Sequence, residues 1–465
     1  MEIQFVVKFV VVFLVLQSLH CGGGEAQIPQ RAPLPPSTPR LSQALIDEPV
    51  FAGQAYVIEA GPEQAPWVVL LHGIGDSGAR DWNELIPELA KNYRVLAFDL
   101  PGFGRSSREN ERYTPDSYVR FVKWLVTERV EGPFYLVGHS MGATLAMLYA
   151  ATHPEDLKKL VIADAAGILE HHSLVDFWGN ERSLFFKRAS RRSGDVLGWA
   201  NNFLLNIGDE EKLRFFIETH AAREKHLDGN PTRIAGLAMI LKNFGPAVEK
   251  ITTPTLIIWG GEDIVAPMRV AQVLSRNIPA ANLEVIPGVG HVPMIERPVL
   301  FSEMVLDFLG STSESDLEPP VEKPRNDSAR KGRCDGRRDM ILTGDYAEIE
   351  ISGCERAKLR DVRASKLTIT RSTVIIEASE IAGAPVGLDV SNSEVLVTNT
   401  LLGGDVAIKT KGSVLDIAGG KIEWKKEAVA VAGASQLVFS VCQAKSPDTT
   451  WYLHGLHSLQ VGESL

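Results

Sequence analysis

The sequence predicts an α/β domain with a parallel sheet covered by helices, followed by an all-β domain. Between about Leu41 and Leu309, apolar runs of strand length alternate with segments of helical spacing, which is typical of a parallel sheet buried on both faces. From residue 340 onward the runs are shorter and alternate residue by residue, as in Glu348–Ile351, which is typical of half-buried strands. The apolar runs of the first part are Trp67–Leu71, Arg94–Phe98, Phe134–Val137, Lys159–Ile162 and Thr255–Trp259.

Length and composition limit the classes of protein that fit. A chain of 465 residues exceeds what one hydrophobic core usually organises, so two or more folded units are expected. The net charge of −10 disfavours a nucleic-acid partner, because binding phosphates requires clustered Lys and Arg. The four cysteines show no paired short spacing, and His171 and His172 would point apart on a helix. The sequence therefore predicts no metal site and indicates no cofactor.

Residues 1–26 predict a signal peptide. The unbroken apolar run Phe9–Leu16 follows Lys8, as in the core of an export signal. Cys21 precedes three glycines, so a lipoprotein signal with lipid on Cys21 is one alternative, and cleavage after Ala26 is the other. A retained membrane anchor ranks behind both. In a bacterium the chain would be periplasmic or attached to the outer membrane through its N-terminus, and otherwise it would be secreted.

Composition divides the rest of the chain. Proline-rich residues 27–40 favour an extended spacer, and residues 41–310 form the predicted α/β domain. Within that domain the strand signals vanish over about residues 167–250, which predicts an inserted helical cap. Charge, serine and proline crowd residues 311–339, which predicts a linker, and residues 340–465 form the β-domain.

The segment Gly138–Gly142 has the pattern of a serine nucleophile. It follows the apolar strand that ends at Val137 and precedes the helical run Ala143–Ala150. A nucleophilic serine projects from a sharp strand-to-helix turn, and glycines two residues to either side let the backbone pass. An ordinary strand-to-helix turn could have the same sequence, so the assignment of Ser140 as a nucleophile depends on its catalytic partners.

Asp263 and His291 are the predicted partners of Ser140. A serine hydroxyl needs a base within hydrogen-bond reach and a buried carboxylate that orients this base. Asp263 follows the run that ends at Trp259, and His291 follows another predicted strand, Leu283–Ile286. Loops at the carboxyl ends of parallel strands collect functional groups.

The order Ser, Asp, His, together with two further motifs, resembles the α/β-hydrolase superfamily over about residues 50–309. Leu71–Gly75 is similar to its oxyanion loop, and Asp99–Ser106 is similar to the turn after its next strand. The resemblance implies that the backbone N–H groups of Ile74 and Met141 bind the oxyanion of a tetrahedral intermediate. The combined motifs are most similar to capped carboxylesterases and to hydrolases of ring-cleavage products.

Three other residues near these motifs could take part in the site. His72 and His139 belong to the matching motifs, and we expect them to support loop packing rather than to transfer protons. Asp164 ends the strand at Lys159–Ile162 and could replace Asp263 as the orienting acid, as in some members of the superfamily.

We therefore expect an exported serine hydrolase that cleaves a small-molecule carboxylic ester, thioester or lactone through an acyl-enzyme on Ser140. A carbon–carbon bond hydrolase of the ring-cleavage type is the first alternative, because its reaction also passes through an oxyanion. The second alternative is a catalytically silent surface-binding or scaffold protein that uses the β-domain.

The β-domain contains an internal repeat of about twenty residues. Ser365–Ile369 aligns with three later segments that each begin with serine, and Ala347–Ile351 is the expected first copy. Two short strands per repeat predict a solenoid, and the segment resembles the right-handed parallel β-helix family. In such a stack Cys354 and Cys442 would occupy equivalent places in the first and last coils, too far apart to bond. The domain would position the enzyme near a surface or a polymer. The later segments are Ser393–Val397, Ser413–Ile417 and Ser435–Phe439.

Overall fold

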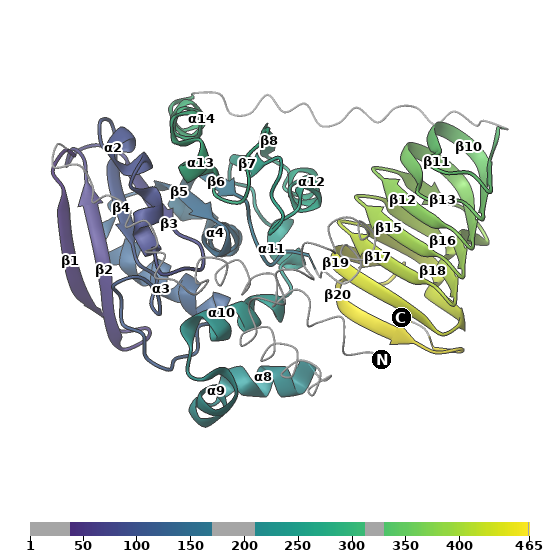
Figure 1. Cartoon of the computed structure of the whole chain (residues 1–465), viewed down its shortest axis with the longest axis horizontal. Helices are drawn as coiled ribbons and strands as arrows, with labels where there is room; N and C mark the ends of the chain where they lie inside the picture. The colour runs from purple at the N-terminus through teal and green to yellow at the C-terminus, as the bar shows by residue number, and fades with distance from the viewer. Residues whose placement is uncertain (1–37, 170–209, 312–329, 464) are drawn as a thin grey trace, which may run out of the picture. The chain divides into compact units, whose positions relative to one another are not determined.

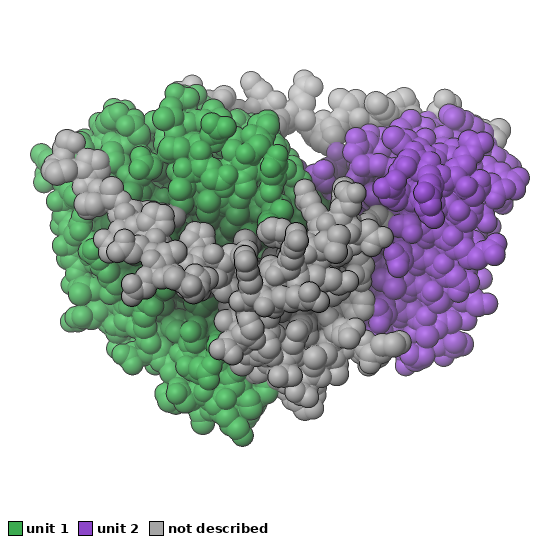
Figure 2. Space-filling view, in the orientation of Figure 1, with its two compact units in different colours: residues 1–242, 247–271, 278–316 green, residues 243–246, 272–277, 317–465 purple. Residues whose placement is uncertain are grey.

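The computed structural model describes most of the chain as two compact units, which Figure 2 colours separately. One unit is built around a mixed sheet and the other around the later β-strands, and each is described by itself. The expected signal peptide with Cys21, most of the spacer, the first part of the cap and most of the linker lie outside the described residues. No described helix has the length and apolar composition needed to cross a bilayer. The described residues are 38–169, 210–311, 330–463 and 465.

The first unit contains an eight-stranded sheet of described strands in the order β1-β2-β4-β3-β5-β6-β7-β8. The pairs β1–β2 and β2–β4 are antiparallel, and the other pairs are parallel. The parallel strands confirm the predicted fold class. Every residue of β3 and β7 is buried, which is why their sequences are continuously apolar. The strands are β1 Ser42–Glu48, β2 Gly53–Ala60, β3 Trp67–Leu71, β4 Arg94–Phe98, β5 Phe134–His139, β6 Leu157–Ala163, β7 Thr255–Gly260 and β8 Ala281–Ile286.

Helices pack on both faces of this sheet (Figure 1). On one face Trp82 and Phe301 join the apolar cluster that also holds Val137. On the other face, the ring of Phe98 contacts Phe121. The helices of the α/β part are η1 Gly78–Trp82, α2 Leu85–Leu89, α3 Pro115–Arg129, α4 Met141–Thr152, η2 Pro154–Asp156, α12 Met268–Asn277, α13 Pro293–Glu296 and α14 Pro298–Gly310.

The described part of the expected cap is helical. It contains α8 Glu210–Glu218, α9 His220–Leu227, α10 Pro231–Ile240 and α11 Gly245–Val248. The buried guanidinium of Arg223 donates to the side chain and the carbonyl oxygen of Asn110 and to the carbonyl oxygen of Ile217. These bonds fasten α9 to the segment that precedes α3.

The second unit is a stack of parallel strands that ends in one antiparallel strand, β20. Successive coils pair in register, with an offset of 21 residues at Leu367↔Leu388, Val374↔Val395 and Ile381↔Leu402. The offset is 17 residues at Leu359↔Ile376 and 22 residues at Leu415↔Leu437. The inward residues of these strands form a continuous apolar core. The strands are β9 Lys331–Asp335, β10 Ile341–Ser352, β11 Ala357–Thr370, β12 Thr373–Glu377, β13 Glu380–Ala382, β14 Val386–Ser391, β15 Glu394–Thr398, β16 Leu401–Lys411, β17 Val414–Ala418, β18 Lys421–Gly433, β19 Ser435–Lys445 and β20 Thr450–Leu459.

Two details of the expected repeat are wrong. Ser365–Ile369 pairs with β14, whereas the three later segments that begin with serine lie in the series β12, β15, β17 and β19. Each coil therefore contributes three strand segments rather than the expected two. The three series of stacked strands share the same alternation of inward and outward residues, so the sequence period alone does not distinguish one series from another. The β-domain also begins earlier than expected, because β9 lies inside the segment predicted as linker.

A column of buried serines runs along one corner of the stack. The hydroxyl of Ser393 donates to the carbonyl oxygen of Ser391 and accepts from the backbone N–H of Ser372 at 3.1 Å. Ser372, Ser413 and Ser435 repeat this arrangement, and Cys354 continues the column with its N–H bonded to Ser372. Each hydroxyl thus satisfies a backbone donor that the corner leaves without a strand partner.

Cys334 and Cys354 of the β-domain form a disulfide, and Cys442 is buried, with its Sγ 3.1 Å from the carbonyl oxygen of Ile417. The expectation that Cys354 does not bond to Cys442 is confirmed. The two are not in equivalent places, however, because the register puts Gly420, rather than a residue of the serine column, beside Cys442.

Candidate active site

Ser140 occupies the sharp turn between β5 and α4. Its backbone has φ 52° and ψ −120°, a conformation that costs a residue with a side chain on the order of 1–3 kcal/mol. Its N–H donates to the carbonyl oxygen of Ala163 at 3.0 Å, and its carbonyl oxygen accepts from Ala166 at 3.3 Å. The end of the neighbouring strand β6 therefore holds the strained turn in place.

The glycines of the motif permit close backbone contact around Ser140. A Cβ atom at Gly142 would collide with the carbonyl oxygens of Leu71 and His72, and a Cβ at Gly73 would lie 2.9 Å from the Cβ of Ser140. The loop after β3 therefore lies directly against the turn that carries the serine.

The structure brings Ser140, His291 and Asp263 together in one hydrogen-bonded chain. His291 Nε2 lies 2.9 Å from Ser140 Oγ, and His291 Nδ1 lies 2.7 Å from Asp263 Oδ2. Since the carboxylate can only accept, Nδ1 carries a proton and Nε2 is free to accept one from the serine. The imidazole is the most exposed of the three, whereas the Asp263 side chain is fully buried.

The loop after β7 fixes the Asp263 carboxylate. Its Oδ1 accepts from the N–H groups of Val265 at 2.7 Å and Ala266 at 3.0 Å. Trp259 Nε1 in turn donates to the carbonyl oxygen of Ala266 at 2.8 Å. These bonds leave Oδ2 for His291.

Two residues brace the loop that carries His291. The carboxylate of Glu296 accepts from the N–H groups of Gly290 at 3.0 Å and Val292 at 3.4 Å. His139 Nε2 donates to the carbonyl oxygen of His291 at 2.7 Å. The sequence indicated a supporting role for His139 but did not point to Glu296. The only signal for Glu296 was its position just after the predicted base.

His72 links the predicted oxyanion loop to the segment after β4 through its two ring nitrogens. Nε2 accepts from the N–H of Leu100 at 2.8 Å, so Nδ1 carries the proton that bonds to the carbonyl oxygen of Gly73 at 2.6 Å. Burial lowers the pKa of this imidazole, and the charge of Asp99 offsets part of that effect. His72 is therefore a neutral structural residue.

The two predicted oxyanion donors stay a prediction. Ile74 follows Gly73 in the loop that lies against Ser140, and Met141 is the first residue of α4. The first N–H groups of a helix have no carbonyl partner within the helix, so the N–H of Met141 is suited to binding an anion.

Asp164 lies beside Asp263 but does not take its place as the hydrogen-bond partner of His291. His291 Nδ1 bonds to Asp263 Oδ2, while Asp164 Oδ1 accepts from the N–H of Gly260 at 2.9 Å. Burial raises the pKa of Asp164 well above its usual range, and the negative charge of Asp263 adds to this effect. The structure therefore favours Asp263 as the orienting acid.

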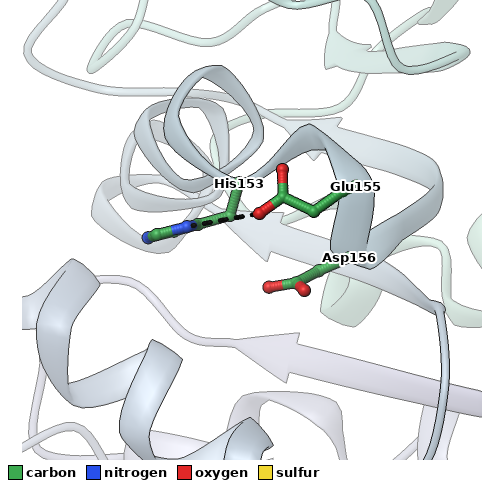
Figure 3. A group of neighbouring side chains, drawn as sticks. All are labelled: His153, Glu155 and Asp156. Carbon is green, nitrogen blue, oxygen red and sulfur yellow. Dashed lines mark ion pairs between the residues drawn. The ribbon is translucent and has the colours of Figure 1, made fainter.

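Figure 3 shows a second cluster of titratable groups, His153, Glu155 and Asp156, beyond the C-terminal end of α4. His153 Nδ1 lies 3.8 Å from Glu155 Oε1. Asp156 Oδ2 accepts from Lys123 Nζ at 2.6 Å and from the Tyr149 hydroxyl. Burial acts to raise the pKa of Asp156, but these two hydrogen bonds outweigh it and lower the pKa. The cluster is thus accounted for by its own ion pairs and hydrogen bonds. The pair His171 and His172 lies outside the described residues.

Comparison with known proteins identifies the family of the α/β part. The profile of the Alpha/beta hydrolase family matches residues 68–304, and the chain belongs to this family. It is 27% identical to the 2-hydroxy-6-oxo-6-(2'-aminophenyl)hexa-2,4-dienoic acid hydrolase of Metapseudomonas resinovorans, over 59% of this chain and 94% of that protein. It is 30% identical to the 2-hydroxymuconate semialdehyde hydrolase of a Pseudomonas species, over 52% of this chain and 86% of that protein. Among solved structures, naproxen esterase of Bacillus subtilis is 21% identical with a TM-score of 0.41, covering 58% of this chain and 92% of its own.

Proposed function

We propose that the chain is a serine hydrolase that cleaves a carboxylic ester, thioester or lactone. The observation that carries the proposal is the hydrogen-bonded chain from Ser140 Oγ through His291 to Asp263. A base that is held by a buried carboxylate and bonded to a serine on a strained turn is the arrangement that acyl transfer requires.

The reaction would proceed through an acyl-enzyme. His291 Nε2 accepts the proton of Ser140 Oγ while that oxygen bonds to the carbonyl carbon of the substrate. The tetrahedral intermediate collapses, and the released alcohol or thiol takes the proton from His291. Water then attacks the acyl group, His291 accepts its proton, and the acid leaves as the proton returns to Ser140.

The negative oxygen of the intermediate would be held by the N–H groups of Ile74 and Met141. Each such donor contributes on the order of 3 kcal/mol to the stability of the transition state. Because both donors are backbone groups, the identity of the two side chains matters little for this role.

A fluorophosphonate probe tests the proposal against a catalytically silent protein. The probe reacts with an activated serine, so we expect one label per chain, lost in Ser140→Ala and kept in the matched variant Ser275→Ala on α12. Well-folded wild-type protein that takes no label would support the scaffold alternative.

Cleavage of an activated carbon–carbon bond is the second function that the site could perform. Two relatives are named as hydrolases of a dienoic acid and of a semialdehyde, and an oxyanion site would serve that reaction too. Steady-state rates on a neutral p-nitrophenyl ester series and on a ring-cleavage product separate the two. A kcat/KM at least about 100-fold higher on the ring-cleavage product would replace the ester proposal.

We also propose that the β-domain is a right-handed parallel β-helix that contacts a surface or polymer. We further propose that the chain is exported and that Cys21 is its lipid attachment point. The parallel coils support the β-helix. The Cys334–Cys354 disulfide supports export, because disulfides persist in oxidising compartments. Fractionation of cells expressing wild type and Cys21→Ser tests the attachment. Loss of the protein from the membrane fraction in Cys21→Ser is expected, and an unchanged distribution would contradict it.

A further inference from the structure

A second carboxyl group, that of Asp164, is buried beside the acid that orients His291. Asp164 follows β6, has a left-handed backbone with φ 44°, and is 0% exposed. Its Oδ1 accepts from the N–H of Gly260 at 2.9 Å. Gly260 ends β7, the strand that leads to Asp263, so Asp164 is tied to the base of the loop that carries the acid.

The other oxygen of Asp164, Oδ2, accepts no hydrogen bond from the residues that the structure describes. Among the residues that the structure describes, Oδ2 is buried and has no partner, and such an atom costs about 1–3 kcal/mol. One carboxyl oxygen of Asp164, one of Asp263 and one ring nitrogen of His291 all lie within 4.8 Å of one another. The carboxyl group of Asp164 thus lies close to Asp263, the acid that orients His291.

Two buried carboxylates this close repel each other, so a proton on one of the two groups is favoured. Asp263 accepts from two backbone N–H groups and from His291, whereas Asp164 accepts from one backbone N–H. Hydrogen bonds to the ionised form favour it. These hydrogen bonds therefore favour the proton on Asp164 over Asp263. The other charged group that acts on Asp164 is Glu296, whose negative charge favours the same result.

We propose that Asp164 is a neutral carboxylic acid that donates a hydrogen bond from Oδ2 to the Asp263 carboxylate and acts as a positioning residue for it. The bond would give Oδ2 a partner and would hold the Asp263 carboxylate in addition to its bonds from two backbone N–H groups and from His291. Burial and the charge of Asp263 both raise the pKa of Asp164, which agrees with a protonated group at neutral pH. The kinetic part of the proposal rests on the proposed function, and the spectroscopic part does not.

The first experiment detects the proton directly. Infrared difference spectra of the full chain at neutral pH should contain the C=O stretching band of a protonated carboxyl group, and the band should be absent in Asp164→Asn. Ser140→Ala should retain the band, so this readout is independent of turnover. Absence of the band in wild-type protein would overturn the proposal, whether or not the chain is a hydrolase.

The second experiment separates a neutral donor from a charged group. Asn has the shape of the neutral acid, with an N–H donor for Asp263 and an oxygen for Gly260. Asp164→Asn should therefore keep kcat within about threefold of wild type. Asp164→Leu removes both bonds and should lower kcat at least tenfold, with KM changed less than twofold.

Two kinetic outcomes would overturn the proposal. A loss in Asp164→Asn as large as that in Asp263→Asn would mean that the negative charge of Asp164 is needed. Wild-type rates in Asp164→Leu would mean that Asp164 positions nothing. If Asp164→Leu fails to fold, Asp164→Asn and the infrared band still decide.

Discussion

The imidazole of His139 donates a hydrogen bond of 2.7 Å to the backbone carbonyl oxygen of His291, and the centroids of the two imidazole rings lie 5.0 Å apart. One residue of the turn that presents Ser140 therefore also holds the loop that presents the base. The distance from Ser140 Oγ to His291 Nε2 is set by this bond as well as by Asp263. His139 thus affects the reaction through position rather than through proton transfer.

His139 should influence kcat more than KM. His139→Phe keeps an aromatic ring against Trp82 but removes the donor to His291, so we expect kcat to fall about tenfold with little change in KM, since a small misplacement of a catalytic group is costly. His139→Gln places an amide N–H near the same point and should recover most of the rate. Equal losses in both variants would indicate a packing role alone.

The charge of Asp263 should be essential. Asp263→Asn cannot hold the Nδ1–H tautomer of His291, so kcat on a small ester should fall about 10⁴-fold. Ser140→Ala and His291→Ala should be similarly inactive, because the three residues act as a unit. Asp116→Asn, an exposed partner of Lys242, is the matched control and should retain full activity. An active Asp263→Asn enzyme would exclude Asp263 as the orienting acid.

His72 should make the protein less stable in mild acid. Burial lowers its pKa in the folded state below the usual value of 6.5, so the unfolded chain binds a proton first as the pH falls. The free energy of unfolding then decreases below about pH 6.5, by up to about 1.4 kcal/mol per pH unit, until the pH reaches the lowered pKa. His72→Gln can accept from Leu100 without titrating. Urea denaturation at several pH values should show a shallower slope in this variant, and identical slopes would contradict the assignment.

Gly142 should tolerate no side chain. A Cβ there would collide with the carbonyl oxygens of Leu71 and His72, so Gly142→Ala should destabilise the α/β unit by about 2–3 kcal/mol. Gly236 lies within α10, where a Cβ meets no atom within 4 Å. Gly236→Ala should stabilise the protein by about 0.5–1 kcal/mol. Thermal denaturation followed by circular dichroism distinguishes them, and changes of the same sign would contradict this account.

The serine column should protect the backbone of the β-domain. Ser393→Ala removes the acceptor of the Ser372 N–H, and an unpaired buried donor costs about 1–3 kcal/mol. Hydrogen exchange at the Ser372 amide should become at least tenfold faster. Exchange at Val362, whose N–H bonds to Ser379 in another column, should stay unchanged. Unaltered exchange at Ser372 would show that water replaces the hydroxyl.

The sequence predicted the strands whose burial leaves a strong pattern. β3, β4 and β7 are apolar because helices or neighbouring strands cover them, and their predicted bounds match to within a residue. β1 did not stand out, since five of its seven residues are exposed. β9 was taken for linker because Lys331 and Arg333 face outward, and only Gly332 and Cys334 are buried.

The site was predictable where chemistry dictates residue type. Ser140, Asp263 and His291 stand at the ends of strands that the pattern located, so the fold brings them together. The supporting bonds of His139 and Glu296 depend on the path of a loop, which no periodicity encodes. The burial of Asp164 beside Asp263 likewise follows from the packing of two strands rather than from local sequence.

A stack of parallel coils has an open edge at its last coil. The backbone N–H and C=O groups of that edge have no following coil to pair with. Here the chain turns back, and β20 runs antiparallel along β19. The N–H of Gly462 then donates to Val431 in β18. A second molecule could pair with β19 in the manner of a further parallel coil only after displacing β20, so the reversal covers the edge at which the parallel stack would otherwise continue.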